Sequence, residues 1–290
     1  MKKIIKFLSM SVLAVAAMPA FSQDAPVTLE QAWATDTILK TPESVLYDQQ
    51  RDVIYVANIN QIHKDSTDKD GFISRLKPDG TVDKLKWISG LNDPKGMAIY
   101  KNTLYVSDLT ELLEIDIAKG KVVKRHKPEG AIFLNDVATD TQTGEVLISD
   151  SYSNKVYKLK NGISLLWLKE DIADKPNGLL IEQEHVVLAT MGGEGKVHKV
   201  KKNGAKEKEA TLFTADIKST DGIASDGKGN YFISNWAGEI YYVNAKGDKW
   251  KILDTKEQKV NSADIDYSLK YNLLLVPTFF NNRVVAYKVK

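Results

Sequence analysis

Apolar and polar residues follow one pattern that recurs six times along this chain. In each copy an apolar residue stands two positions after the opening residue, and a second short apolar run follows. The apolar third positions lie 52, 40, 42, 44 and 42 residues apart, at Val45, Met97, Val137, Leu179, Ile223 and Ile265. A period of this length indicates one structural unit repeated in a solenoid or a propeller.

Each copy carries the signals of short strands. Nine to eleven residues beyond each third position, an apolar residue precedes Ala, Ser or Pro and then Asn, Asp or Thr, as in Val106-Ser107-Asp108. The runs leading into these triplets are rich in β-branched and aromatic residues, which favour strands. A glycine turn such as Ala118-Lys119-Gly120 then joins a second pair of strands. We therefore expect an all-β fold, a six-bladed β-propeller with four-stranded antiparallel blades.

The sixth copy ends too early to complete its blade. The chain stops at Lys290, directly after an apolar strand, and no residues remain for the outermost strand. Because an open sheet edge is a liability, we expect residues 32–39, ahead of the first copy, to supply that strand and close the ring. The long first interval is explained by a polar insertion at residues 63–71. Residues 23–290 then form a single domain.

The amino terminus has the features of an export signal. Residues 1–22 combine three lysines, an apolar run shorter than a membrane span and a small-residue site at Ala20-Phe21-Ser22. We expect cleavage after Ser22, no membrane span in the mature chain, and a periplasmic or secreted location. Cleavage leaves 37 basic and 38 acidic residues, and no basic block interleaved with aromatics, so nucleic-acid binding is not expected.

Composition narrows the chemistry further. Of the 290 residues, 43% are hydrophobic and 27% charged, as in ordinary globular proteins. Because the chain has no cysteine, disulfides, thiolate metal sites and cysteine nucleophiles are excluded. The four histidines share no repeat position, and no Gly-x-Ser-x-Gly elbow is present.

The opening residues of the six copies form the candidate site. In a propeller, equivalent positions of the innermost strands surround the central channel. These positions are Glu43, Lys95, Asn135, Asn177, Asp221 and Ala263. Two carboxylates and two amides are oxygen ligands that suit a hard divalent cation, and Ca²⁺ is the expected one. We assign Glu43, Asn135, Asn177 and Asp221 as its ligands.

Two features leave alternatives open. Asn177-Gly178 and Asp221-Gly222 are also turn dipeptides, which occur at strand entries for conformational reasons alone. Lys95 would either repel a metal ion or bind an anionic group of a substrate. We assign Lys95 and Asn135 to substrate binding.

At these residues the sequence resembles the gluconolactonase, regucalcin and senescence-marker family of six-bladed propellers. The resemblance rests on Glu43-Ser-Val-Leu-Tyr-Asp48, Pro176-Asn177-Gly178-Leu179 and Asp221-Gly222 with the turn 226–229. It implies a divalent metal in the channel, held by Glu43, Asn177 and Asp221. The arginine that gluconolactone-type members place two residues before Asn135 is Phe133 here. The run of residues 135–150 resembles the related paraoxonase and strictosidine-synthase-like propellers equally well.

Two functions are therefore predicted as alternatives. The first is an exported, metal-dependent hydrolase of a lactone or related ester, in which Asp221 accepts the proton of the attacking water. The second is a non-catalytic propeller that binds a small-molecule ligand or a protein at its channel face. The oligomeric state is not predicted.

Overall fold

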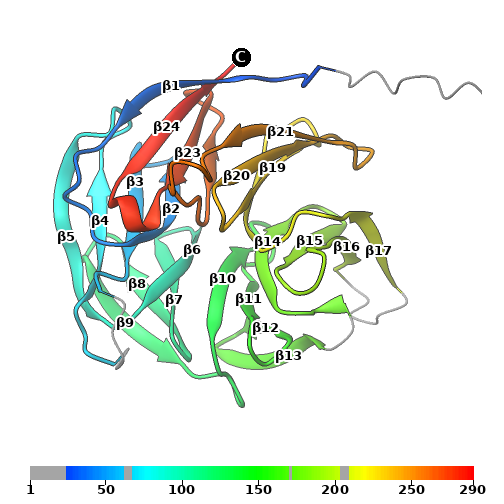
Figure 1. Cartoon of the computed structure of the whole chain (residues 1–290). Coiled ribbons are helices and arrows are strands. Elements are labelled where there is room, and N and C mark those ends of the chain that lie inside the picture. The colour runs from blue at the N-terminus through cyan, green and yellow to red at the C-terminus, as the bar shows by residue number, and fades with distance from the viewer. Residues whose placement is uncertain (1–23, 62–66, 170–171, 203–208) are drawn as a thin grey trace, which may run out of the picture.

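The strands of the chain form six four-stranded antiparallel sheets arranged in a ring (Figure 1). The computed structural model describes residues 24–61, 67–169, 172–202 and 209–290. The expected signal peptide therefore lies outside the described residues, as do residues 63–66 of the insertion and the glycine turn of the fourth copy, at residues 203–204. The predicted all-β, six-bladed propeller is confirmed.

Each of the first five blades is built from four consecutive strands. Blade 1 contains β2 (Pro42–Asp48), β3 (Val53–Asn58), β4 (Gly71–Leu76) and β5 (Val82–Leu91). Blade 2 contains β6 (Pro94–Tyr100), β7 (Thr103–Asp108), β8 (Glu111–Asp116) and β9 (Lys121–His126). Blade 3 contains β10 (Leu134–Thr139), β11 (Val146–Asp150), β12 (Lys155–Lys160) and β13 (Ile163–Lys169). Blade 4 contains β14 (Pro176–Ile181), β15 (His185–Thr190), β16 (Val197–Lys201) and β17 (Ala210–Thr214). Blade 5 contains β18 (Thr220–Ser225), β19 (Tyr231–Asn235), β20 (Glu239–Val243) and β21 (Lys249–Asp254).

Blade 6 joins the two ends of the chain. It contains β22 (Asp266–Ser268), β23 (Leu273–Pro277), β24 (Val284–Val289) and β1 (Leu29–Ala34), with the 3₁₀ turn η3 (Phe279–Asn281) before β24. In Figure 1 the blue β1 runs beside the red β24, and the two pair antiparallel from Leu29–Val289 to Ala34–Val285. Closure by an N-terminal strand is confirmed. The strand begins three residues before the predicted span and ends at Ala34, since a turn follows and Leu39 is buried in the core instead.

The hydrophobic core lies between neighbouring blades. One cluster packs Tyr55 and Ile73 of blade 1 against Leu104 and Leu113 of blade 2, all buried. Similar clusters lie between the other pairs of blades, including the pair that closes the ring. The alternating apolar positions of each strand therefore serve both faces of its sheet, as expected for radially packed sheets. Among the described residues, no helix is long and apolar enough to cross a membrane.

The inner strands of blades 1 to 5 share a bulge at the position that faces the channel. The register shifts between Pro42 and Ser44, and at the matching places in blades 2 to 5. In blade 2, for example, Pro94 pairs with Asp108 and Met97 with Val106, so Lys95 and Gly96 lie in the irregular step. A bulge redirects side chains out of the regular alternation. It explains how the first two residues of each copy leave the sheet pattern.

Serines on the second strands support this irregular backbone. Ser149 Oγ accepts from Asp136 N at 2.9 Å, and Ser234 Oγ accepts from Gly222 N at 2.9 Å. Ser234 Oγ also donates to Ala263 O of the next blade at 2.7 Å. The serine that recurs in the second sequence motif therefore satisfies backbone groups that the bulge removes from the ladder.

Candidate functional site

One cavity collects all five polar opening residues of the repeat. A cavity of about 540 Å³ at one end of the channel is lined by Glu43, Lys95, Asn135, Asn177 and Asp221. Each of these residues is buried, and each comes from a different blade. Ala263, the sixth ring residue, is fully buried and packs with Ile59 and Phe279. The structure thus brings together the polar opening residues of the copies, as the repeat predicted. We call the six opening residues the ring residues and this cavity the ring cavity.

Glu43 presents an unsatisfied oxygen. Its side chain is 6% exposed, and its Oε2 is buried without a hydrogen-bond partner among the described residues. A buried carboxylate oxygen without a partner costs free energy, so such atoms usually face a cation, a proton or an ordered water. The backbone beside it is fixed, because Glu43 O accepts from Asp264 N at 3.0 Å across the blade 1–blade 6 junction.

The two amides leave their oxygens available. Asn135 donates its Nδ2 to Ser151 Oγ at 3.1 Å. Asn177 donates its Nδ2 to Thr220 O at 3.3 Å and to Asp221 Oδ1 at 3.2 Å. Neither amide oxygen accepts a hydrogen bond from the residues that the structure describes. Both side chains are therefore held through nitrogen, with an acceptor oxygen free for a ligand.

Burial shifts the acids of the ring away from their usual ionisation. Desolvation raises the pKa of Glu43 to about 8, although the charge of Lys95 opposes it, and nearby Asp221 raises it further. Desolvation also raises the pKa of Asp221 to about 7, against the hydrogen bond from Asn177 and the charge of Lys95. Carboxylates in this situation are stabilised as anions by a bound cation.

The residues fit a divalent cation of the oxygen-preferring kind. Within the described part of the chain, no three His, Cys, Asp or Glu side chains are grouped closely enough to hold a metal ion by themselves. The ring instead offers two carboxylates and two amides. The unsatisfied oxygen of Glu43 and the available amide oxygens match the mixed carboxylate and carbonyl ligands that Ca²⁺ accepts.

Aspartates at the ends of the second strands position the loops that enter the cavity. Asp150 accepts from Ile132 N at 2.8 Å and from Phe133 N at 3.0 Å, which fixes the backbone just before Asn135. Asp108 does the same for Asn92 N in blade 2. In these two blades, the Asp that ends the second sequence motif thus fixes the backbone of the loop before the inner strand of its own blade. Its position in the sequence did not reveal this role.

Aromatic side chains form two walls of the cavity. Phe133 stacks on Tyr152 with ring centroids 4.5 Å apart, while Trp236 meets Phe279 edge to face at 4.4 Å. Ile59 packs with Phe279, so the second wall is apolar. Tyr152, Trp236 and Phe279 therefore all line the cavity.

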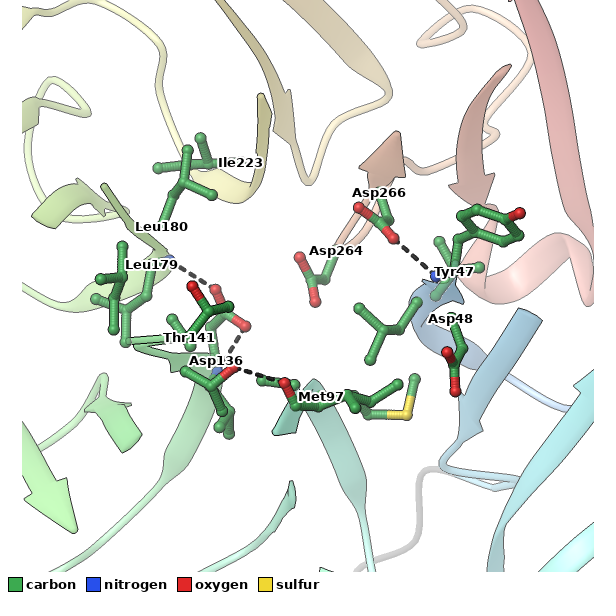
Figure 2. Close-up of a pocket in the computed structure, with 18 of the residues that line it drawn as sticks. Tyr47, Asp48, Met97, Asp136, Thr141, Leu179, Leu180, Ile223, Asp264 and Asp266 are labelled. Carbon is green, nitrogen blue, oxygen red and sulfur yellow. Dashed lines mark hydrogen bonds between the residues drawn. The ribbon is translucent and has the colours of Figure 1, made fainter. Parts of the chain in front are cut away.

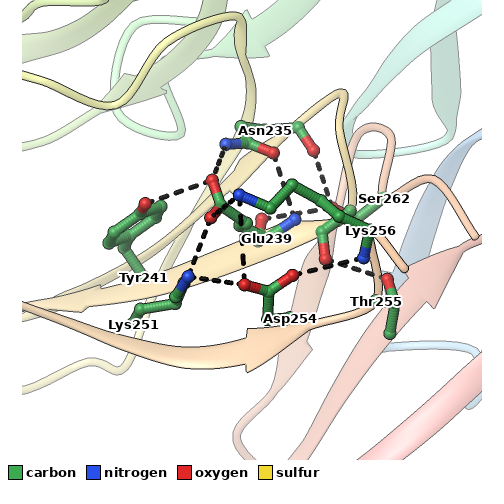
Figure 3. A network of polar contacts seen from close by, with 9 residues as sticks. Asn235, Glu239, Tyr241, Lys251, Asp254, Thr255, Lys256 and Ser262 are labelled. Carbon is green, nitrogen blue, oxygen red and sulfur yellow. Dashed lines mark hydrogen bonds and ion pairs between the residues drawn. The ribbon is translucent and has the colours of Figure 1, made fainter. Parts of the chain in front are cut away.

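A polar network supports the Trp236 wall (Figure 3). Glu239 lies at its centre and accepts from Asn235 at 2.6 Å, Lys256 at 2.6 Å and Lys251 at 3.0 Å. Ser262 Oγ then donates to Asn235 O at 2.8 Å, and Asn261 Nδ2 donates to Trp236 O at 2.7 Å. The network therefore ties the loop before blade 6 to the backbone of Trp236.

A second layer of the channel was not predicted. Asp136 and Asp264 occupy the second position of the repeat in opposite blades and line another cavity, of about 560 Å³, further along the inner strands (Figure 2). Asp136 accepts from Val137 N and Leu179 N, both at 2.6 Å, and Asp264 accepts from Ser44 Oγ at 2.6 Å. Burial raises the pKa of Asp136 to about 7 and that of Asp264 well above its ordinary value. The signal was present in the sequence, since the other second positions are three Gly and one Ser.

Comparison with known proteins shows which solved structures share this fold. No protein-family model matches the chain, and no curated protein matches its sequence. Among solved structures, a gluconolactonase from Xanthomonas campestris superimposes with a TM-score of 0.68 at 13% identity, over 90% of this chain and 87% of that one. The resemblance to gluconolactonase propellers holds for the fold.

Two further propellers show how widely this fold is used. A catalytically inactive virginiamycin B lyase from Staphylococcus aureus, solved with quinupristin, has a TM-score of 0.63 at 12% identity, over 90% of this chain and 99% of that one. A chain of a nidogen/laminin complex has a TM-score of 0.61 at 13% identity, over 75% of this chain and 86% of that one. At such identities the similarity establishes the architecture, and function has to be argued from the site.

Proposed function

We propose that the chain is an exported, Ca²⁺-dependent hydrolase that acts on a lactone or related ester at the ring cavity. The observation that carries the proposal is the buried, unsatisfied Oε2 of Glu43, which shares one cavity with Asp221, Asn135 and Asn177. Export rests on the pattern of residues 1–22, which lie outside the described part of the chain.

Each ring residue has a defined part in this proposal. Glu43, Asn135, Asn177 and Asp221 would hold the cation through their oxygens. The cation would supply electrophilic activation of the ester carbonyl and a lower pKa for nearby water. Asp221, which lines the same cavity, would accept the proton of the attacking water. Asn135 binds the substrate from blade 3.

The aromatic walls of the cavity give a substrate apolar surface to pack against. Phe133 and Tyr152 stand on one side, and Trp236 and Phe279 on another, so an ester that enters the cavity exchanges water for apolar contacts. The similarity of fold to a gluconolactonase agrees with lactone chemistry.

A panel of hydrolysis assays tests the proposal. The mature protein is assayed by pH-stat with glucono-δ-lactone, dihydrocoumarin and phenyl acetate, in Ca²⁺ and in EGTA. We expect hydrolysis of at least one compound in Ca²⁺ alone, and its loss in Asp221→Ala. Lys175→Met serves as the control, because Lys175 is an exposed residue of the same cavity wall outside the ring. Hydrolysis that ignores Ca²⁺, or an Asp221→Ala variant with full activity and Ca²⁺ affinity, contradicts the proposal.

A binding propeller is the second candidate. It is favoured by Lys95, a cationic residue inside the ring, and by the structural similarity to a chain of the nidogen/laminin complex. This alternative requires no metal. Absence of bound Ca²⁺ together with absence of hydrolysis across the panel would favour it.

A further inference from the structure

Lys95 is a buried cation without a polar partner. Its side chain is 5% exposed and lines the ring cavity. Among the described residues it makes no hydrogen bond and no ion pair, and its Nζ lies 4.9 Å from the ring centroid of Phe133. Because Nζ has no acceptor among the described residues, its N–H groups can donate to a ligand that enters the cavity.

The surroundings of Lys95 hold the ammonium in place without satisfying it. Phe133 stacks on Tyr152, which is 58% exposed at the cavity mouth. A cation over an aromatic face is attracted to the ring, but that contact supplies no acceptor for its N–H groups. The three donors of Lys95 therefore remain available to a ligand in the cavity.

The charge balance of the cavity points to an anion. Lys95 lowers the pKa of both Glu43 and Asp221, so it lies within electrostatic range of each. If Glu43 and Asp221 hold a divalent cation, the charged residues of the cavity lining, which also include Asp93, Lys95 and Lys175, carry a net charge of +1 together with the cation, and this favours an anionic ligand. Lys175, the other lysine of the cavity wall, is exposed and is screened by solvent.

We infer that Lys95 is a specificity-determining residue that binds a carboxylate of the substrate. The substrate class is then a carboxylate-bearing ester or lactone whose apolar part packs against Trp236 and Phe279. This inference rests on the proposed function for the position of the reacting carbonyl and deepens it by naming the substrate's charge.

The experiment uses two probes of equal shape that differ in charge. They are the carboxylate anion phenylacetate, which is distinct from the ester phenyl acetate, and the neutral phenylacetamide. Their binding to the mature protein is measured by titration calorimetry, in Ca²⁺ and in EGTA. A charge-assisted hydrogen bond predicts about tenfold to hundredfold tighter binding of phenylacetate in Ca²⁺. In Lys95→Met this preference should vanish while phenylacetamide affinity stays unchanged, and Lys95→Arg should retain most of it.

Lys175→Met is the matched control, because it removes the same charge from an exposed position of the same cavity wall. It should keep the preference for phenylacetate. Equal affinities of the two probes for the wild type, no phenylacetate binding at about 10 mM, or a preference that survives in Lys95→Met would overturn the inference. Tighter Ca²⁺ binding by Lys95→Met with an unchanged preference would do so too, since Lys95 would then be only a counter-charge to the acids.

The readout separates the two proposals. Carboxylate preference that depends on Lys95 without ester hydrolysis would uphold anion binding by Lys95 and reject the hydrolase. Hydrolysis of neutral esters with no carboxylate preference would do the reverse. Circular dichroism and melting temperature confirm that each variant is folded.

Discussion

Asn177 donates its Nδ2 to Asp221 Oδ1 at 3.2 Å, across the boundary between blades 4 and 5. This contact joins two ring residues that are separated by 44 positions in the chain. It fixes Asp221 with one carboxylate oxygen occupied by a donor and keeps the oxygen of Asn177 available. The candidate cation site is thus partly organised without the cation.

Replacing the donor by a second acid should reveal the site's affinity for cations. In Asn177→Asp two buried carboxylates replace the hydrogen bond, which should destabilise the metal-free protein by about 1–3 kcal/mol. The same variant should gain more thermal stability from Ca²⁺ than the wild type, because the cation neutralises an extra charge. Differential scanning fluorimetry in EGTA and in Ca²⁺ measures both effects. Unchanged melting temperatures in both buffers would count against a cation at this ring.

The blades pack closely around the channel. We therefore predict that Gly222, which follows the ring residue Asp221, cannot be replaced by a residue with a side chain without loss of stability. A Cβ at Gly222 would lie 2.5 Å from Ile265 N and 2.8 Å from Asp264 Cα, so backbone would have to move. Overpacking of this kind costs about 1–3 kcal/mol, and Gly222→Ala should lower the denaturation midpoint accordingly. Gly90→Ala is the comparison, because a Cβ there meets no atom within 4 Å and only its positive φ is strained. An equal or larger loss in Gly90→Ala would contradict this account.

The ring closure predicts a sharp boundary for truncation. Removal of residues 23–34 deletes β1, leaves β24 as an open edge and exposes the partners of Leu29 and Trp33, at a cost of about 2–4 kcal/mol. Removal of residues 23–26 spares β1 and should leave the melting temperature unchanged. Thermal denaturation of the two truncated proteins makes the comparison. Equal stability would show that β1 contributes nothing to closure.

Glu239 predicts a loss of stability in acid. Burial raises the pKa of Glu239, but hydrogen bonds from Lys256, Lys251 and Asn235 outweigh it and bring the pKa down to about 2, from 4.5. A lowered folded-state pKa contributes stability that is complete above the unfolded value of about 4.5 and disappears as the pH falls toward 2. With both lysines partly exposed, the contribution is of the order of 2 kcal/mol.

Glu239→Gln tests that prediction through the pH dependence of unfolding. At neutral pH the variant should be less stable than the wild type, and the two curves should converge between pH 4.5 and 2 as Glu239 takes up its proton. Urea denaturation at a series of pH values measures the difference. A constant gap at every pH would mean that the charge of Glu239 does not contribute.

Much of the fold was accessible from the sequence because each blade is a local structure. The apolar third positions and glycine turns repeat with a nearly constant period, so the six blades could be counted before any distance was known. The closing strand was harder, since its pairing with β24 spans the whole chain. The position of residues 32–39 in front of the first blade indicated the partner, while the exact register depended on the turn that follows Ala34.

The candidate site was only partly accessible. Glu43, Asn177 and Asp221 stood out because equivalent positions of a propeller converge on one axis. Asp136 and Asp264 were missed, although they already stood out at second positions that are otherwise Gly or Ser. For Asp136, the bulge that turns two consecutive residues toward the channel appears only when the strands pair. The isolation of Lys95 over Phe133 likewise depends on side-chain packing between blades 2 and 3, which no sequence period encodes.

Calorimetric titration of Ca²⁺ into the dialysed mature protein tests the central claim most directly. We expect one site per chain, removed by Glu43→Gln and kept by Lys175→Met, since among the described residues of the cavity Glu43 combines burial in the ring with an unsatisfied carboxylate oxygen. No binding, or binding that survives Glu43→Gln unchanged, would contradict the claim that the ring cavity is a cation site.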